Sequence, residues 1–447
     1  MRVWNRRGLY ILAFLLFSAL CGILVIFLTG RSAERQLRAD HDKGVKLIRE
    51  YWSKEPARPV LRGEALPGNG GAKLAEMLDV MESEQPEPPW SLLLSSVRGK
   101  SSPDSRVKVE EAYAYGKKFL PGVREALQHE HCRLPFDYVG PERGLHYQDP
   151  FHIKNRVIFL EALLLQNARR LAGQGEYAAA LRDVADAIRL GHDLGRGTGM
   201  ISFQSTGNPG EGAAVGLVAQ LLHEHPFPPE ALESFLAEVR LLRSTRPRVG
   251  FGSVVEEYYP IILAHNMYQG ALTGQTASDL GAMTGLSISV LRRRGLRLEQ
   301  YHESFKEYRR IVGLEYAKAE AEMPGFLERS ERQAGAFFVC RPDPLRTKEA
   351  DLYDAMRLAC LEAGLVAHLC RSSHDGVWPE TLAGCGELPL DPWGEAPLRY
   401  KPPTEGMPAI IYSISTNRRD DGGEAESPFL DKSPDYVFHL GPWPELK

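Results

Sequence analysis

The sequence lacks a strong excess of charge of either sign. Its 54 Lys and Arg residues nearly balance its 58 Asp and Glu residues, which gives a formal net charge of -4 over 447 residues. Domains that bind nucleic acid are usually strongly basic, so this class of function is disfavoured. The hydrophobic fraction of 43% is ordinary for a globular protein. A chain of this length has room for about two or three folding units.

The sequence also lacks the familiar catalytic motifs. It contains no GxSxG nucleophile elbow, no P-loop and no kinase motif. The His-Glu-His triplets at 129–131 and 223–225 do not have the HExxH spacing of zincins. Histidines two apart point to different sides of a helix, which favours surface or helix-end positions over a metal site. The glycine-rich run at 207–216 has no strand before it, so it predicts a loop and a helix start rather than a dinucleotide site.

No two of the six cysteines form a CxxC pair, which disfavours a zinc ribbon or a thioredoxin-type motif. The last four would suit one or two disulfides in an oxidising compartment, and they suit reduced core cysteines equally well. The six are Cys21, Cys132, Cys340, Cys360, Cys370 and Cys385.

One long uncharged stretch stands near the N-terminus. Residues 9–28 read LYILAFLLFSALCGILVIFL. At 1.5 Å per residue, a helix of this length matches a hydrocarbon core of about 30 Å. A cleaved signal peptide would have a shorter apolar region ending in small residues, so we predict a retained transmembrane anchor that contacts membrane lipid.

The basic residues around this stretch bear on its orientation. Arg2, Arg6 and Arg7 precede it, but more basic residues follow it between 31 and 46. Basic flanks favour the cytoplasmic side, yet large domains cross a membrane largely regardless of charge. We predict a single-pass protein of the cell inner membrane with an extracytoplasmic body.

The rest of the chain predicts a mainly α fold. After the anchor and its short basic head (1–30), we expect a stalk and linker at 31–106 and a helical domain at 107–345. A small α+β module is expected at 346–447, where short alternating runs and turns replace long helical periods. Separate helices are predicted at 211–223, 229–242, 254–268, 298–322 and 348–371.

The clearest helical pattern lies at 157–194, where two amphipathic helices meet at 173–175. Here Gly175, Tyr177, Ala180 and Ala187 have the spacing of a tetratricopeptide repeat, and the segment resembles one hairpin of that family. The resemblance implies that the small residues let the helices approach closely while Tyr177 fills the groove between them. No second copy follows at that period, so the resemblance covers one unit of a helical hairpin array.

The C-terminal region contains HDGVWPETLAG, LPLDPWGEAPLRYKP, AIIYSIS and TNRRDDGG, in this order. It resembles the C-terminal part of the major pseudopilin of type II secretion systems. The matching residues are Gly376, Trp378 and Pro379 in the turn, Asp391, Pro392, Trp393, Gly394 and Tyr400 in the middle, and Tyr412 and Ser413 in a strand. The family's glutamate at the fifth mature position is missing, because Ala13 stands there relative to Gly8.

This resemblance implies a calcium site in the loop after the Tyr-Ser pair, because calcium prefers several oxygen ligands. The candidate metal ligands are Asn417, Asp420 and Asp421, with Ser413 and Ser415 as helpers. Arg418 and Arg419 would oppose a cation, so an ion-free turn is the alternative.

Together these features predict a membrane-anchored scaffold or binding protein of an envelope or secretion-related assembly. We expect a protein partner, no nucleic acid and no catalysis. The alternative is a membrane-tethered hydrolase whose site is assembled from distant residues, such as His152, His192 or His223 with nearby carboxylates. Such an enzyme would place a histidine and a carboxylate within hydrogen-bond reach.

Overall fold

Helices dominate the structure, a computed structural model of the chain. It describes residues 58–84, 89–97, 103–134, 150–198, 209–247, 298–333, 344–394, 396–405, 407–423 and 435–441, with residues 35, 38–47 and 50. The predicted mainly α fold with a small sheet part is confirmed over these residues. The predicted anchor at 9–28 and the predicted helix at 254–268 lie outside them. In the part that is described, no helix is both long and apolar enough to cross a membrane.

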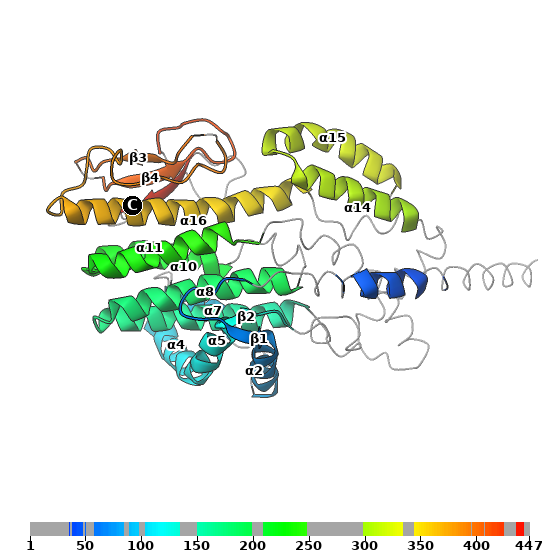
Figure 1. Ribbon diagram of the computed structural model, residues 1–447, viewed down its shortest axis with the longest axis horizontal. Helices are drawn as coiled ribbons and strands as arrows, with labels where there is room; N and C mark the ends of the chain where they lie inside the picture. The colour runs from blue at the N-terminus through cyan, green and yellow to red at the C-terminus, as the bar shows by residue number, and fades with distance from the viewer. Residues whose placement is uncertain are drawn as a thin grey trace, which may run out of the picture.

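The predicted hairpin at 157–194 is present as helices α7 (Pro150–Gly173) and α8 (Tyr177–Thr198), which pack along one another (Figure 1). Every residue from 156 to 166 is buried, as expected for a helix that neighbours cover on all sides. The turn depends on Gly175, whose φ of 81° lies in the left-handed region that glycine adopts without steric cost.

A second hairpin packs on the first. It consists of α10 (Pro209–Glu224) and α11 (Pro229–Ser244), and both predicted helices are confirmed with small shifts of their ends. The predicted helix start in the glycine-rich run is the first turn of α10. The ring of Tyr177 lies 4.8 Å from that of Phe227, in the loop between α10 and α11. Tyr177 therefore contacts the next hairpin and helps to join the two.

Helices from the N-terminal part of the body also pack against α7 (Figure 1). They are α2 (Gly71–Glu84), α3 (Trp90–Val97), α4 (Pro103–Gly116) and α5 (Leu120–Leu127), with the short 3-10 helix η1 (Lys117–Phe119) between the last two. Strand β1 (Leu66–Asn69) pairs in parallel with β2 (His129–His131). The boundary predicted at residue 106 falls inside α4.

The first His-Glu-His triplet forms β2, which begins directly after the C-cap of α5, and its three residues are partly exposed. Residues two apart share one face of a strand, whereas they diverge on a helix. His129 Nδ1 lies 2.9 Å from the carbonyl oxygen of Pro67, across the β1–β2 pair. Burial, with Arg133 nearby, lowers the pKa of His131. Short strands of this kind carry little sequence signal because the period is too brief to detect.

The helix predicted at 298–322 is two helices, α14 (Leu298–Gly313) and α15 (Tyr316–Gln333), which pack against each other. The break follows Gly313, and glycine is a weak helix former. Charged pairs link the two helices, among them Arg310 with Glu322 and Arg329 with Glu307. The prediction missed the break because the polar and apolar pattern continues across it.

Helix α16 (Pro344–Ser373) confirms the helix predicted at 348–371 and lies between two layers. One side packs against α10 and α11, and the other carries an antiparallel sheet of β3 (Arg399–Lys401), β4 (Ile410–Ser413) and β5 (Tyr436–His439) (Figure 1). A Cβ atom on Gly364 would lie 2.5 Å from the ring of Phe438, so glycine permits the close contact of β5 with α16.

Trp393 of the DPWG segment fixes the C-terminal module to the helices. The indole is buried and meets the rings of Tyr316 on α15 and Tyr353 on α16 edge-on, at 5.0 and 5.3 Å between centroids. Edge-to-face contacts of this kind stabilise beyond the area that they bury.

Candidate functional site

The three predicted metal ligands lie in one turn after β4. Asn417 donates a hydrogen bond to Asp421 through its side-chain amide. Asp420 accepts one from the backbone N–H of Gly422 at 3.0 Å and one from Arg399 Nε at 2.9 Å. The structure thus brings the predicted oxygen donors together, but a guanidinium already contacts one of them.

Other charged residues reach this turn from elsewhere in the chain. Asp435, just before β5, accepts a hydrogen bond of 2.6 Å from the N–H of Gly423. Burial, together with the charges of Asp420 and Asp421, raises the pKa of Asp435. Lys401 of β3 donates to the carbonyl oxygen of Gly422. Within the described residues, no group of three or more His, Cys, Asp or Glu is arranged to hold a metal ion.

Calcium at this turn stays a prediction and can be tested by thermal unfolding. We expect calcium at about 100 times its dissociation constant to stabilise the folded state by about 2.7 kcal/mol, because the ion binds only the folded loop. Arg399→Gln should strengthen the effect, since it frees an oxygen of Asp420. Asp421→Asn should weaken it, and Asp375→Asn in an exposed turn is the matched control. An unchanged melting temperature in the native chain and in Arg399→Gln would refute the calcium site.

The expected calcium helper Ser413 contacts a different carboxylate. Its hydroxyl donates to Asp391 Oδ1 at 2.7 Å. Asp391 is buried and also accepts from the backbone N–H groups of Trp393 and Ile414, both at 3.0 Å, while Arg399 Nη1 lies 3.4 Å away. The Asp391 carboxylate therefore connects the DPWG turn, β3 and β4, which makes it the structural centre of the C-terminal module.

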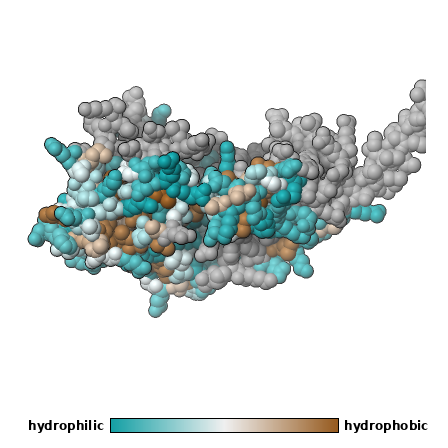
Figure 2. Space-filling model, turned by 90° about the horizontal axis from the view of Figure 1, so that it is seen from above, coloured by the Kyte–Doolittle hydropathy of each residue, from teal (hydrophilic) through white to brown (hydrophobic). Residues whose placement is uncertain are grey.

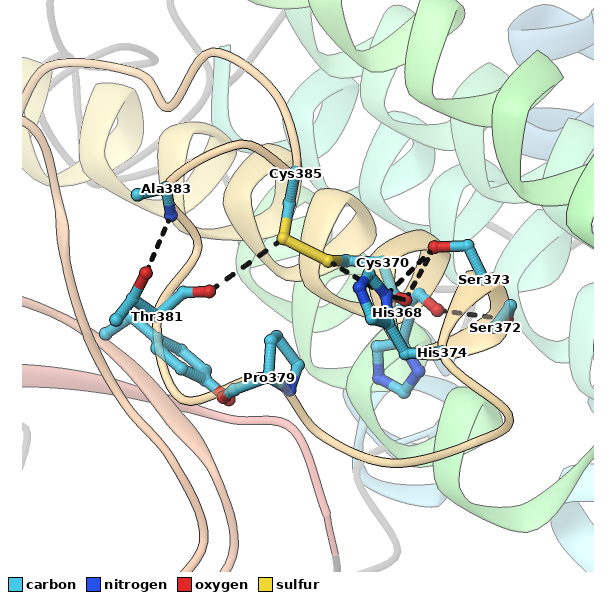
Figure 3. The surroundings of a disulfide bond; sticks show 10 residues. His368, Cys370, Ser372, Ser373, His374, Pro379, Thr381, Ala383 and Cys385 are labelled. Carbon is cyan, nitrogen blue, oxygen red and sulfur yellow. Dashed lines mark hydrogen bonds between the residues drawn. A yellow bond between two sulfur atoms is a disulfide. The ribbon is translucent and has the colours of Figure 1, made fainter.

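A disulfide between Cys370 and Cys385 joins the end of α16 to the following loop (Figure 3). This loop also carries Trp378, which stacks edge-on against His368 at 5.0 Å between centroids. Burial lowers the pKa of His368 to about 4. Two further cysteines, Cys132 and Cys360, are buried free thiols. The sequence left open whether the last four cysteines form disulfides, and in the structure two of them, Cys370 and Cys385, are joined.

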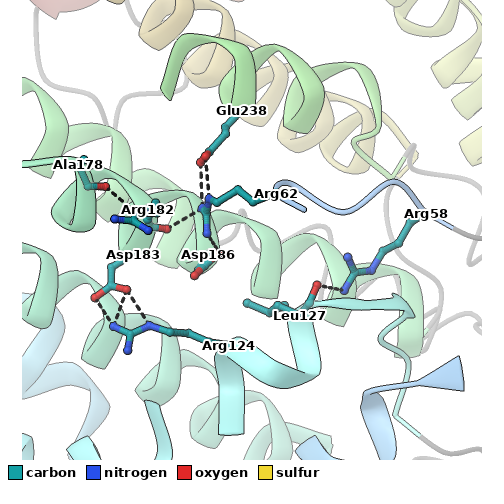
Figure 4. A network of polar contacts seen from close by, with 9 residues as sticks. All are labelled: Arg58, Arg62, Arg124, Leu127, Ala178, Arg182, Asp183, Asp186 and Glu238. Atoms are coloured by element: carbon teal, nitrogen blue, oxygen red, sulfur yellow. Dashed lines mark hydrogen bonds and ion pairs between the residues drawn. The ribbon is translucent and has the colours of Figure 1, made fainter. Parts of the chain in front are cut away.

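Acidic residues on α8 bind arginines from two other segments, α5 and the chain at 58–62 (Figure 4). Asp183 pairs with Arg124 of α5 at 2.7 Å. Asp186 pairs with Arg62 at 3.0 Å, and the same guanidinium bonds to Glu238 of α11 at 2.7 Å. Burial raises the pKa of Asp186 to about 6.

The next acidic residue along α8 completes this row. Asp193 pairs with Arg58 at 2.8 Å and lies 3.6 Å from Arg189, and all three are buried. Arg189 donates to the carbonyl oxygen of Pro59 at 2.7 Å. We call residues 58–62 the strap, because its two arginines hold an extended segment on α8. The strap has the composition of a linker, and the one sequence signal for its partners is the presence of carboxylates among the apolar residues of α8.

Of the three histidines proposed for a hydrolase, one meets a carboxylate. His192 Nε2 on α8 lies 2.9 Å from Glu211 Oε2 on α10, with exposed side-chain fractions of 4% and 1%. His223 is exposed on α10, and the side chain of His152 lies outside the described part of α7. The His192–Glu211 pair has the donor and acceptor of an acid–base couple, in a place that water reaches poorly.

Comparisons of the chain with protein-family models, curated proteins and solved structures found no match. Three arrangements in the described residues bear on function: the C-terminal module on α16, the charged row on α8 and the His192–Glu211 pair.

Proposed function

We propose that this chain is a membrane-anchored scaffold or binding protein of an envelope or secretion-related assembly. The observation that carries the proposal is the double role of α16, which packs on α10 and α11 and also supports the sheet of the C-terminal module. Trp393 and the Cys370–Cys385 disulfide add further attachments. A module attached this firmly is suited to present a binding surface at a fixed position relative to the helical array.

The disulfide supports the extracytoplasmic placement of the body. Stable disulfides form in secreted and periplasmic compartments and are rare in the cytosol. The bond closes a loop between residues 15 apart in the sequence, and such a loop is stabilised by about 3 kcal/mol in the chain-entropy description. A body folded outside the cytoplasm would gain this stability.

The C-terminal module offers apolar side chains to a protein partner. Val377 is 67% exposed, Leu390 61% and Met407 50%. Figure 2 shows this side of the molecule, where hydrophilic residues cover most of the coloured surface and hydrophobic ones are scattered among them. Apolar side chains scattered over a surface are common, so these three positions serve as probes of an interface and do not by themselves define one.

Site-directed photo-crosslinking in intact cells tests the proposal. A photo-reactive residue at Val377 or Leu390 should give a discrete product of higher mass, because these side chains would lie in the interface. The matched control is Val107 on α4, which is 64% exposed and distant from the module (Figure 1). Identical patterns at all three positions, or no product at any of them, would refute a binding role for the module.

A second arm of this experiment tests the membrane placement. A membrane-impermeant maleimide should label Val107→Cys in intact cells and should label Asn5→Cys only after lysis. The reverse pattern would place the body in the cytoplasm. Recovery of the full-length chain in the soluble fraction without detergent would remove the anchor from the proposal.

The hydrolase alternative rests on the hydrogen bond between His192 and Glu211. A histidine paired with a carboxylate can act as a general base. Both side chains are buried, which favours a structural pair over a site that substrate reaches. Hydrolysis of p-nitrophenyl acetate by the purified chain, lost in His192→Asn but kept in His223→Asn, would favour the enzyme.

A further inference from the structure

A cluster of charged residues lies where α16 meets the second hairpin. We call it the acid latch, and it consists of Glu211 in the first turn of α10, Arg246 after α11, and Asp351, Asp354 and Arg357 on α16. Arg246 donates to the carbonyl oxygen of Asp351 at 2.8 Å and also contacts its carboxylate. Arg357 Nη1 donates to Asp354 at 2.9 Å. The contacts of Arg246 connect α16 with the end of α11, whereas the Arg357–Asp354 bond lies within α16.

Glu211 brings α10 into the same cluster. A Cβ atom on the neighbouring Gly212 would lie 3.6 Å from the guanidinium of Arg357, which places the first turn of α10 against that side chain. Glu211 and Asp354 are both buried. The positive charges of Arg246 and Arg357 act on both carboxyls, and the two carboxyls also repel one another.

The acid latch contains more carboxyls than guanidiniums. Glu211, Asp351 and Asp354 share the guanidiniums of Arg246 and Arg357. Lys348 of α16 also acts on the partly exposed Asp351, but it acts on Glu315 as well. The buried carboxyls of Glu211 and Asp354 therefore keep an excess of negative charge when all groups are ionised. A buried charge without a partner is expensive, and a carboxyl then takes up a proton. Other titratable or charged groups facing the cluster are Glu161 of α7, His192 of α8, Tyr353 of α16 and Tyr436 of β5. Glu161 adds a further carboxyl and His192 a further base, so together they do not remove the excess of negative charge.

We propose that the acid latch holds one proton while α16 is docked on the second hairpin, and that losing this proton loosens α16 together with the sheet that it supports. The device makes presentation of the C-terminal module depend on pH. It differs from the binding role proposed above, because a scaffold could hold its module equally firmly at every pH.

The direction of the pH dependence follows from the carboxyls. Burial raises the pKa of Glu211 and of Asp354 to about 7, from ordinary values of 4.5 and 3.8. Between about pH 4 and pH 7 the unfolded chain has released the proton that the folded chain keeps. The stabilisation is therefore full below about pH 4, declines as the pH rises, and is lost above about pH 7.

Hydrogen exchange of the full-length chain in detergent micelles, corrected for intrinsic exchange rates, tests the acid latch. From pH 6 to pH 8.5 the amides of α16 should lose protection by about tenfold or more relative to those of the α7–α8 hairpin, since each unit of pKa shift corresponds to a factor of ten. Glu211→Gln and Asp354→Asn each remove the excess charge, so each should abolish this difference.

The matched control is Glu362→Gln on the same helix. Glu362 is buried and pairs with Arg240 at 2.9 Å and Arg243 at 2.6 Å, so its surroundings have an excess of guanidinium. This variant should keep the pH dependence of α16 even if its overall stability falls. Equal protection of α16 at both pH values in the native chain would overturn the proposal, and so would loss of the dependence in Glu362→Gln. If Glu211→Gln does not fold, hydrogen exchange of Asp354→Asn and of the native chain at the two pH values still tests the proposal.

Discussion

Replacing Asp391 with alanine should lower the free energy of unfolding by about 3–5 kcal/mol. The change removes a buried carboxylate that accepts hydrogen bonds from Ser413 and from the N–H groups of Trp393 and Ile414. All these donors would stay buried without an acceptor, and each such group costs about 1–3 kcal/mol. Urea unfolding followed by circular dichroism measures the loss.

Asp391→Asn is the graded comparison for this prediction. Its amide oxygen can still accept from Ser413 and Trp393, but its NH₂ group would face the N–H of Ile414 and the guanidinium of Arg399. We expect an intermediate loss. The exposed Asp375→Asn should leave the urea midpoint unchanged. An Asp391→Ala variant as stable as the native chain would show that the module does not depend on this carboxylate.

Replacing Asp193 with alanine should also cost about 3–5 kcal/mol, because it leaves buried positive charge without its counter-ion. Asp193 is the carboxylate that pairs with Arg58 of the strap and lies beside Arg189. Both guanidiniums are shielded from water and cannot be solvated without moving the strap away from α8. The same urea experiment measures the effect, and limited proteolysis near residue 58 should become faster as the strap detaches.

The matched control for Asp193 lies ten residues earlier on the same helix. Asp183→Ala removes the partner of Arg124, whose side chain is 41% exposed and can turn to water. Its loss of stability should therefore be smaller, since an exposed ion pair contributes little. If both variants lost the same stability, burial of the arginine would not be the cause.

Long periodic helices could be predicted from the sequence, and short or extended segments could not. The pairs α7–α8 and α10–α11 repeat their apolar residues over several turns, so their positions were found to within a few residues. The strap and β1 have no such period, since their structure depends on partners over 60 residues away. The residues around Arg58 and Arg62 do not indicate that each arginine pairs with an aspartate on α8.

The candidate site divides in the same way. Asn417, Asp420 and Asp421 are neighbours in sequence, so a shared turn was predictable. Arg399 and Lys401 lie on β3 and Asp435 directly precedes β5, the two strands that flank β4, and the sheet register that aligns them depends on side-chain packing against α16. The contact of His192 with Glu211 joins two hairpins, and hairpin stacking has no signature in a single sequence.

The position of α16 between two layers limits how this chain can be divided. A fragment that starts at residue 346 would carry the sheet but would expose the helix face that normally meets α10 and α11. A fragment that stops at residue 345 would lack α16 and would therefore expose the face of α10 and α11 that this helix covers. Gene fusions that transplant the C-terminal module into another protein should therefore include the second hairpin, because α16 packs against it.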